Sequence, residues 1–155
     1  VAAGLNMRLM GKKNRSKMLD KLAFGDFNKK YENPRTVKDW LSRDTEVVDK
    51  YIADPYCMQI FMSQFFTDLL EGIISINQTN NISKMARVPI YLFSGTMDPV
   101  GEYAKGTRKV YDNLKLAGHD VELKMYEEGR HEMLNEINKD EVYSDFLAWA
   151  DKACQ

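Results

Sequence analysis

The chain has 155 residues, and 22 Lys and Arg against 23 Asp and Glu give it a formal net charge of −1. This length suffices for one domain with a sizeable core, and the balanced charge argues against nucleic acid as a partner. The two cysteines, Cys57 and Cys154, are too few for a disulfide framework and too far apart for a zinc motif. With no signal peptide or membrane span evident in the sequence, we expect a cytoplasmic protein with reduced thiols.

The first 31 residues form a basic and partly apolar segment. They contain eight Lys and Arg against two Asp, and leucines and methionines recur between the charges at roughly helical spacing. This pattern predicts one or two short amphipathic helices. One interpretation is a lid that makes peripheral contact with a membrane through its basic face. The other, which is favoured, is a helical cap with an ordinary solvated face.

Residues 32–57 are predicted to be mostly loop, with a short helix near 36–42 or 46–52. Residues 58–76 form the strongest predicted helix, because apolar side chains recur there at positions i, i+3 and i+4. The polar residues among them argue against a membrane span, which needs about 20 predominantly apolar residues. We expect this apolar stripe to be buried in the core.

A strand–helix–strand unit is predicted between residues 88 and 126. Residues 88–94 are apolar almost throughout, as in a strand that is buried on both faces of a parallel sheet. Residues 102–117 have helical spacing and end before Gly118, and residues 121–126 alternate as in a second strand. A last amphipathic helix is expected from Glu141. The predicted fold class is therefore α/β, with two parallel core strands and flanking helices.

Asp98 follows the first predicted strand, and His131 follows the second. The carboxyl ends of parallel strands meet at one edge of a sheet, and neighbouring strands lie about 5 Å apart, so the two side chains should meet. A carboxylate in that place would fix the tautomer of the imidazole, and a histidine pKa near about 6.5 suits a general base. The alternative is that Asp98 only caps a turn and that His131 is an ordinary loop residue.

Two segments resemble the α/β-hydrolases of the lysophospholipase and monoacylglycerol lipase family, in its bacterial form. They are PIYLFSGTMDPVG at 89–101 and GRHEMLNE at 129–136, and shorter stretches at 24–28, 39–44 and 51–57 resemble the family's cap and cap exit. The resemblance implies that Asp98 is the acid and His131 the base of a catalytic triad, with no metal or cofactor. It also implies a helical cap over residues 1–57 and the C-terminal part of the hydrolase core over residues 58–155.

The serine motif of that family is not found in the chain. None of the nine glycines is followed by another glycine four positions later, so no Gly-x-Ser-x-Gly elbow exists, and Ser63, Ser83 and Ser94 lack that context. Nothing near Cys57 in the sequence would activate it as an alternative nucleophile. We therefore expect a C-terminal fragment of a serine hydrolase that cleaves carboxylic esters, such as monoacylglycerols or lysophospholipids. Such a fragment should be inactive alone and should self-associate through exposed sheet surface.

Two alternatives stay open. One is a different α/β-hydrolase chemistry, such as that of a peptidase, a thioesterase or an epoxide hydrolase, because the missing elbow would decide the reaction. The other is a non-catalytic interaction module that keeps the strand–helix–strand core. Replacement of His131 in a complete protein would separate them, because only an enzyme depends on the imidazole.

Overall fold

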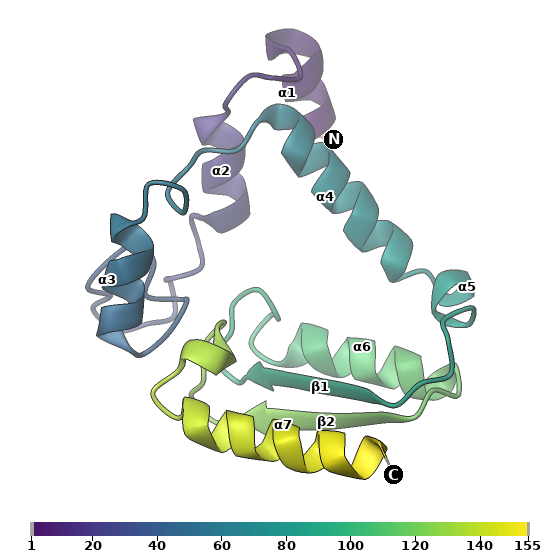
Figure 1. The fold of residues 1–155 in the computed structure, drawn as a ribbon. Coiled ribbons are helices and arrows are strands. Elements are labelled where there is room, and N and C mark those ends of the chain that lie inside the picture. The colour runs from purple at the N-terminus through teal and green to yellow at the C-terminus, as the bar shows by residue number, and fades with distance from the viewer. Residues whose placement is uncertain (1, 155) are drawn as a thin grey trace.

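The computed structural model describes residues 2–154, and a pair of parallel strands lies at its base (Figure 1). Strand β1, Ile90–Gly95, pairs with β2, Val121–Tyr126, along its whole length. Helix α6, Lys105–Leu116, connects the strands and covers one face of the sheet, and helix α7, Lys139–Ala153, covers the other. The predicted α/β class, with two parallel strands and flanking helices, is confirmed.

The two faces of β1 join different hydrophobic clusters, because successive side chains of a strand point to opposite sides. Leu92 packs against the cluster that contains Leu114 of α6. Phe93 packs against the cluster that contains Val142 of α7. Leu114 is 5% exposed and Val142 is fully buried, and burial of such a side chain contributes about 1.5–3 kcal/mol. These contacts hold the sheet between its two helices and fix the strand ends that carry the site.

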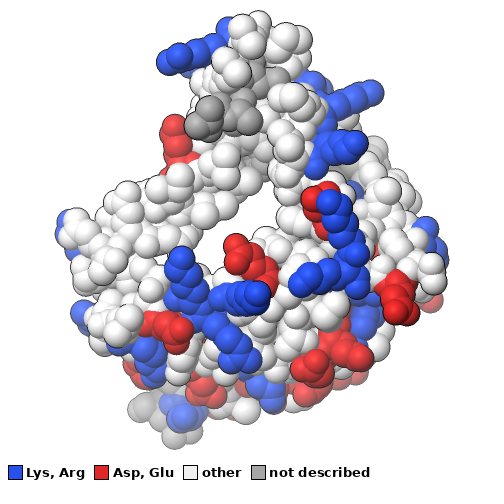
Figure 2. All heavy atoms as spheres, turned by 180° about the vertical axis from the view of Figure 1, so that it is seen from behind, with Lys and Arg blue, Asp and Glu red and all other residues white. Residues whose placement is uncertain are grey.

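The N-terminal part of the chain is helical and forms an arc that returns to the sheet (Figure 1). Its helices are α1 Ala2–Met10, α2 Lys17–Phe24, α3 Thr45–Ala53, α4 Ser63–Ile76 and α5 Thr79–Ile82. Leu19 of α2 and Phe66 of α4, each 4% exposed, form the centre of its packing. Figure 2 shows an opening between this arc and the sheet. Within residues 2–154, every helix is too short or too polar to span a bilayer.

The predicted element boundaries are met most closely in the C-terminal part. The strand at 121–126 has the predicted ends, the first strand begins at Ile90, and Gly118 has the expected positive φ of 79°. The helix predicted from residue 102 begins at Lys105, because the three residues before it have positive φ angles that a right-handed helix cannot contain. The last helix begins at Lys139, slightly earlier than predicted, and a short 3₁₀ helix, Met133–Asn135, precedes it.

Helix α4 differs most from the prediction. It begins at Ser63 rather than near residue 58, because Arg15 holds the preceding residues in extended form: its guanidinium donates to the carbonyl of Ile60 at 2.8 Å. The predicted burial of its apolar stripe is confirmed for Phe66 but is wrong for Leu70 and Ile74, which are 51% and 63% exposed. The helix packs against α1 and α2 near its start and then runs along one side of the opening towards α5. Of the two short helices considered for residues 32–57, the later one forms, as α3.

Candidate active site

Asp98 and His131 lie in the turn after β1 and the loop after β2, and their side chains are in contact. The Nδ1 of His131 lies 3.1 Å from Oδ1 and 3.2 Å from Oδ2 of Asp98. Asp98 is 7% exposed, whereas the side chain of His131 is 37% exposed. With Nδ1 held on the carboxylate, Nε2 is the nitrogen that can exchange a proton with a reacting group.

The turn after β1 orients the carboxylate of Asp98. The backbone N–H of Val100 donates to Oδ1 at 2.8 Å, and the hydroxyl of Ser94 donates to Oδ2 at 3.4 Å. The backbone carbonyl of Asp98 accepts from the N–H of Tyr103 at 2.8 Å. An aspartate that bonds the N–H two residues ahead closes an Asx turn, so Asp98 builds the turn in which it lies. The carboxylate is therefore held in place before any substrate binds.

Two glycines allow the turn after β1 to approach the loop after β2. A Cβ placed on Gly95 would lie 1.9 Å from the carbonyl oxygen of Gly129, which is far inside van der Waals contact. That same carbonyl accepts a hydrogen bond from the N–H of Met97 at 2.9 Å. Because the loops are in backbone contact, the carboxylate and the imidazole that follow them are brought within hydrogen-bonding distance.

The hydrogen bond from His131 to Asp98 raises the pKa of His131 above its ordinary value. Partial burial acts in the opposite direction, and the negative charges of Asp98 and Glu132 add to the increase. A histidine with a raised pKa is a stronger base in its neutral form. The pair therefore has the arrangement that accepts a proton at one nitrogen while the carboxylate stabilises the resulting imidazolium.

The other candidate nucleophiles are Ser94, Ser63 and Cys57. Ser94 is 7% exposed and supports the carboxylate of Asp98. Ser63 begins α4, where its hydroxyl donates to the carbonyl of Asn14 at 3.0 Å. Desolvation and the neighbouring Asp54 raise the pKa of the Cys57 thiol, whereas a nucleophilic cysteine requires a lowered pKa. These positions support the sequence-based preference for a nucleophile other than Cys57.

Trp40 borders the site, in contact with His131. The ring centroids of Trp40 and His131 lie 5.3 Å apart, and Trp40 is 7% exposed. Its carbonyl accepts from the N–H of His131 at 3.3 Å. A tryptophan in a loop gives no periodic signal, so only the resemblance of residues 39–44 to a hydrolase cap indicated this position.

Asp98 and His131 line one side of a cleft of about 720 Å³ between α4, β1 and α6. Its apolar lining includes Ile73, Ile74, Leu92, Val100 and Val110. A cleft of this size suits a small organic ligand. Among the described residues, no group of three or more His, Cys, Asp or Glu is placed to hold a metal ion.

An acid and a histidine at the carboxyl ends of adjacent parallel strands, in the chain order acid then histidine, have the arrangement found in α/β-hydrolases. A family model described as "Serine aminopeptidase, S33" matches residues 4–138, and the chain belongs to this family of α/β-hydrolases. The resemblance found in the sequence is thus confirmed at the level of the α/β-hydrolases. The lysophospholipase or monoacylglycerol lipase subgroup stays a prediction.

Two solved structures have the same fold. One is a highly thermostable carboxyl esterase from Bacillus coagulans in complex with glycerol, with a TM-score of 0.89 and 24% identity over 98% of this chain and 50% of that chain. The other is a lipase in an open form, with a TM-score of 0.85 and 26% identity over 98% of this chain and 50% of that chain. This chain therefore spans half the length of either protein. A comparison with curated proteins found no match.

Proposed function

We propose that this chain carries the acid and the base of a serine hydrolase that cleaves carboxylic esters. The observation that carries the proposal is the hydrogen bond between Nδ1 of His131 and the carboxylate of Asp98, 3.1 Å long, on the wall of a cleft that is lined in part by apolar side chains. Asp98 orients the imidazole, and His131 is the general base. In the same proposal, residues 1–57 are the cap and residues 58–155 belong to the hydrolase core.

The reaction follows from the free nitrogen of His131. Nε2 takes the proton of a serine hydroxyl as its oxygen attacks the ester carbonyl, and then passes that proton to the departing alcohol. Water, activated by the same nitrogen, cleaves the acyl-serine and releases the carboxylic acid. The sequence contains no serine elbow, so in this proposal the serine comes from polypeptide other than these residues.

A lipid-like ester is the substrate class that we favour, in particular a monoacylglycerol or a lysophospholipid. The apolar lining of the cleft supports an acyl chain as ligand, because burial of each methylene is favourable by about 0.8 kcal/mol. The solved structure with 26% identity is that of a lipase. Both observations favour an uncharged, chain-bearing acyl group over a polar one.

The basic N-terminal helices support a peripheral contact of the protein with a lipid surface. Leu9, Met10 and Leu22 are 73%, 63% and 68% exposed and lie on α1 and α2 among basic residues. Figure 2 shows Lys and Arg side chains projecting from this end of the molecule. Co-sedimentation with vesicles tests the contact. We expect the chain to bind anionic vesicles and salt to weaken this binding. We also expect the binding to be lost when Leu9 and Leu22 are both replaced by Ser. Equal recovery with neutral and anionic vesicles would contradict it.

A peptidase is the second candidate function, because the family model that matches the chain is described as a serine aminopeptidase. Both reactions use the same acid–base pair, so Asp98 and His131 do not distinguish them. The two candidates differ in the substrate that the complete protein accepts: a p-nitrophenyl ester of a fatty acid, or an amino-acid p-nitroanilide.

A chimera tests the proposal. The half of the open-form lipase that this chain does not cover would be joined to residues 1–155, in place of that lipase's matching half. We expect the chimera to hydrolyse p-nitrophenyl esters and the His131→Ala chimera to lose nearly all of this activity, whereas the chain alone should show none. A folded chimera whose activity survives His131→Ala would contradict the assignment and favour a non-catalytic role for this chain.

A further inference from the structure

Glu136 is a fully buried carboxylate at the end of the loop that carries His131. Its Oε1 accepts from the backbone N–H of Arg130 at 2.9 Å and from that of Arg43 at 3.1 Å. Its Oε2 accepts from Nε of Arg43 and from the N–H of Ile137, both at 3.0 Å. All four partners are donors, so both carboxylate oxygens act as acceptors.

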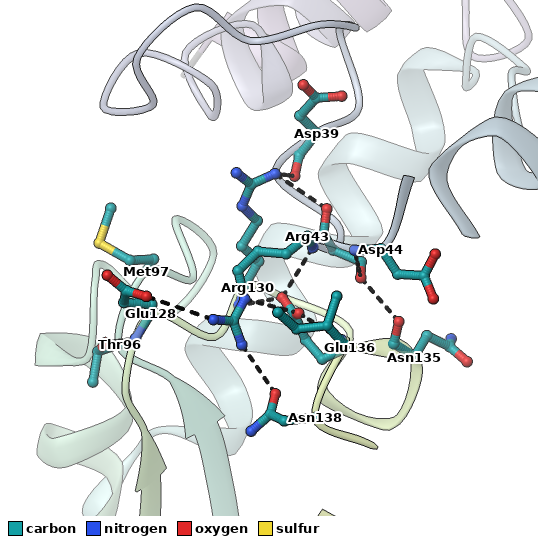
Figure 3. A network of polar contacts seen from close by, with 12 residues as sticks. Asp39, Arg43, Asp44, Thr96, Met97, Glu128, Arg130, Asn135, Glu136 and Asn138 are labelled. Atoms are coloured by element: carbon teal, nitrogen blue, oxygen red, sulfur yellow. Dashed lines mark hydrogen bonds and ion pairs between the residues drawn. The ribbon is translucent and has the colours of Figure 1, made fainter. Parts of the chain in front are cut away.

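The donors to Glu136 come from two segments that are far apart in the sequence. Arg43 belongs to the segment 39–44, which precedes α3, whereas Arg130 and Ile137 flank the loop after β2. Figure 3 shows the carboxylate between these two segments. A buried carboxylate that loses its donors is strongly destabilising. Both segments must therefore be in place for Glu136 to be stable where it is.

Further contacts tie the same two segments together around Glu136. The guanidinium of Arg130 donates to the carbonyls of Asp39 and Ser42, the latter at 3.1 Å. The hydroxyl of Ser42 donates to the carbonyl of Asn135 at 2.9 Å. These bonds cross between the segments in both directions (Figure 3). The network therefore acts as a single clamp, which we define as segment 39–44, segment 129–137 and the bonds between them.

His131 lies inside this clamp. Its backbone N–H donates to the carbonyl of Trp40 at 3.3 Å, and the N–H of Glu132 donates to the carbonyl of Leu41 at 2.8 Å. The imidazole packs against the indole of Trp40 and is hydrogen-bonded to Asp98 through Nδ1. The position of the imidazole thus depends on segment 39–44, although no side chain of that segment bonds its nitrogens among the contacts described.

We propose that Glu136 is a positioning residue that locks the His131 loop to segment 39–44 and thereby holds the imidazole on Asp98. It acts through the backbone of the loop and not on a reacting atom. The inference rests on the proposed function, because that function gives the Asp98–His131 pair its catalytic use. Its structural content, the coupling of Glu136 to the imidazole, does not depend on turnover.

Nuclear magnetic resonance of the 155-residue chain tests this coupling, because the sequence contains only two histidines. His119 is 3% exposed and bonds the carbonyl of Ile82 at 2.8 Å, beside the start of β2 and away from the clamp. It therefore reports whether the fold is intact. His131 reports the site through the pKa of its imidazole and through the exchange rate of its backbone N–H.

The variant Glu136→Gln keeps the shape of the side chain but turns one acceptor into a donor that faces other donors. We expect the pKa of His131 to fall toward its ordinary value, because the hydrogen bond to Asp98 that raises it is weakened. The N–H groups of His131 and Glu132 should exchange at least tenfold faster. The signals of His119 should not move. A residue that only stabilised the fold would lower the denaturation midpoint and leave the pKa of folded His131 unchanged.

Glu132→Gln is the matched control. Glu132 contributes its charge to the pKa of His131 but its side chain bonds only Asn135 among the described contacts. This variant should lower the pKa of His131 without faster exchange of the loop. If Glu136→Gln does not fold, as the signals of His119 will show, Arg43→Lys takes its place, since lysine keeps the charge and loses the bond from Nε.

Two results would overturn the proposal. The first is a folded Glu136→Gln variant in which both the pKa of His131 and the exchange of the loop are unchanged. The second applies if Glu136→Gln fails to fold. It is a folded Arg43→Lys variant in which the pKa of His131 and the exchange of the loop are both unchanged. Either result would leave the proposed ester hydrolysis standing. Conversely, loss of that function in the chimera would leave the measured coupling intact.

Discussion

The sheet with its two helices and the helical arc above it differ in how well their apolar residues are covered. Around β1 and β2, side chains such as Val121 and Val142 are 3% or less exposed. In the arc, Leu19 and Phe66 are buried, but the apolar residues of α4 beyond Phe66 lie open along the cleft. Much of that face carries no charged side chain in Figure 2.

This difference indicates how the site is built. Asp98 and His131 lie on the well-packed layer. Their contact is held by the sheet, by the close approach of Gly95 to Gly129 and by the Asx turn of Asp98. The arc contributes to the site mainly through segment 39–44, the part of it that is joined to the His131 loop. The remaining apolar face of α4 is exposed, and Ile73 and Ile74 line the cleft.

The largest effect is expected from Asp98→Asn in the chimera. An asparagine keeps the size of the side chain but favours the wrong imidazole tautomer, so kcat should fall by about 10⁴-fold. In the proposed function the neutral form of His131 is the base, and the hydrogen bond to Asp98 raises the pKa of His131. The acid limb of kcat/KM should therefore lie above the ordinary histidine value and move to lower pH in the variant. Asp112→Asn, on the exposed side of α6, is the control and should leave the profile unchanged.

A pair of leucine replacements measures the difference in packing between the two regions. Leu114→Ala removes a side chain that is 5% exposed, and it should lower the free energy of unfolding by about 2–5 kcal/mol. Leu70→Ala removes one that is 51% exposed and should change it by about 0.5 kcal/mol or less. Denaturant unfolding of both variants gives the values. Similar losses at the two positions would show that α4 is buried in solution.

Two glycine replacements should have opposite signs. At Gly95 a Cβ would overlap the carbonyl of Gly129, so Gly95→Ala should destabilise the chain by about 1–3 kcal/mol. At Gly72 in α4 nothing lies within 4 Å of a Cβ, so Gly72→Ala should stabilise by about 0.5–1 kcal/mol through helix propensity. Thermal unfolding compares the two. A stabilised Gly95→Ala variant would rule out the close approach of the two loops.

The smallest effect concerns association. Among the described residues β1 pairs on one edge only, and the face of α4 is apolar, so we propose that the chain self-associates weakly. Sedimentation velocity should show a larger species that grows with concentration, and Ile74→Lys, at a position 63% exposed, should reduce it. A monomer at all concentrations would contradict this proposal.

The sequence predicts the layer around the sheet well, because its signals are local. The apolar run before Asp98, the alternation before His131 and the glycine at residue 118 each determine their own element. The contact of Asp98 with His131 then follows from parallel pairing. The link between segment 39–44 and the His131 loop was not predictable in this way. Trp40, Arg43 and Glu136 gain their roles in it from contacts across more than 90 positions of sequence. The start of α4 was missed for the same reason, since Arg15 determines it from a distant part of the chain.

The most direct test of the Asp98–His131 pair is a pH titration of the two histidines in the 155-residue chain by nuclear magnetic resonance. We expect His131 to titrate above the ordinary histidine pKa, with its Nδ1 proton held on the carboxylate, and to titrate lower in Asp98→Asn. The signals of His119 should be the same in both proteins. If His131 titrates at the ordinary value and Asp98→Asn does not change it, the two side chains are not paired in solution.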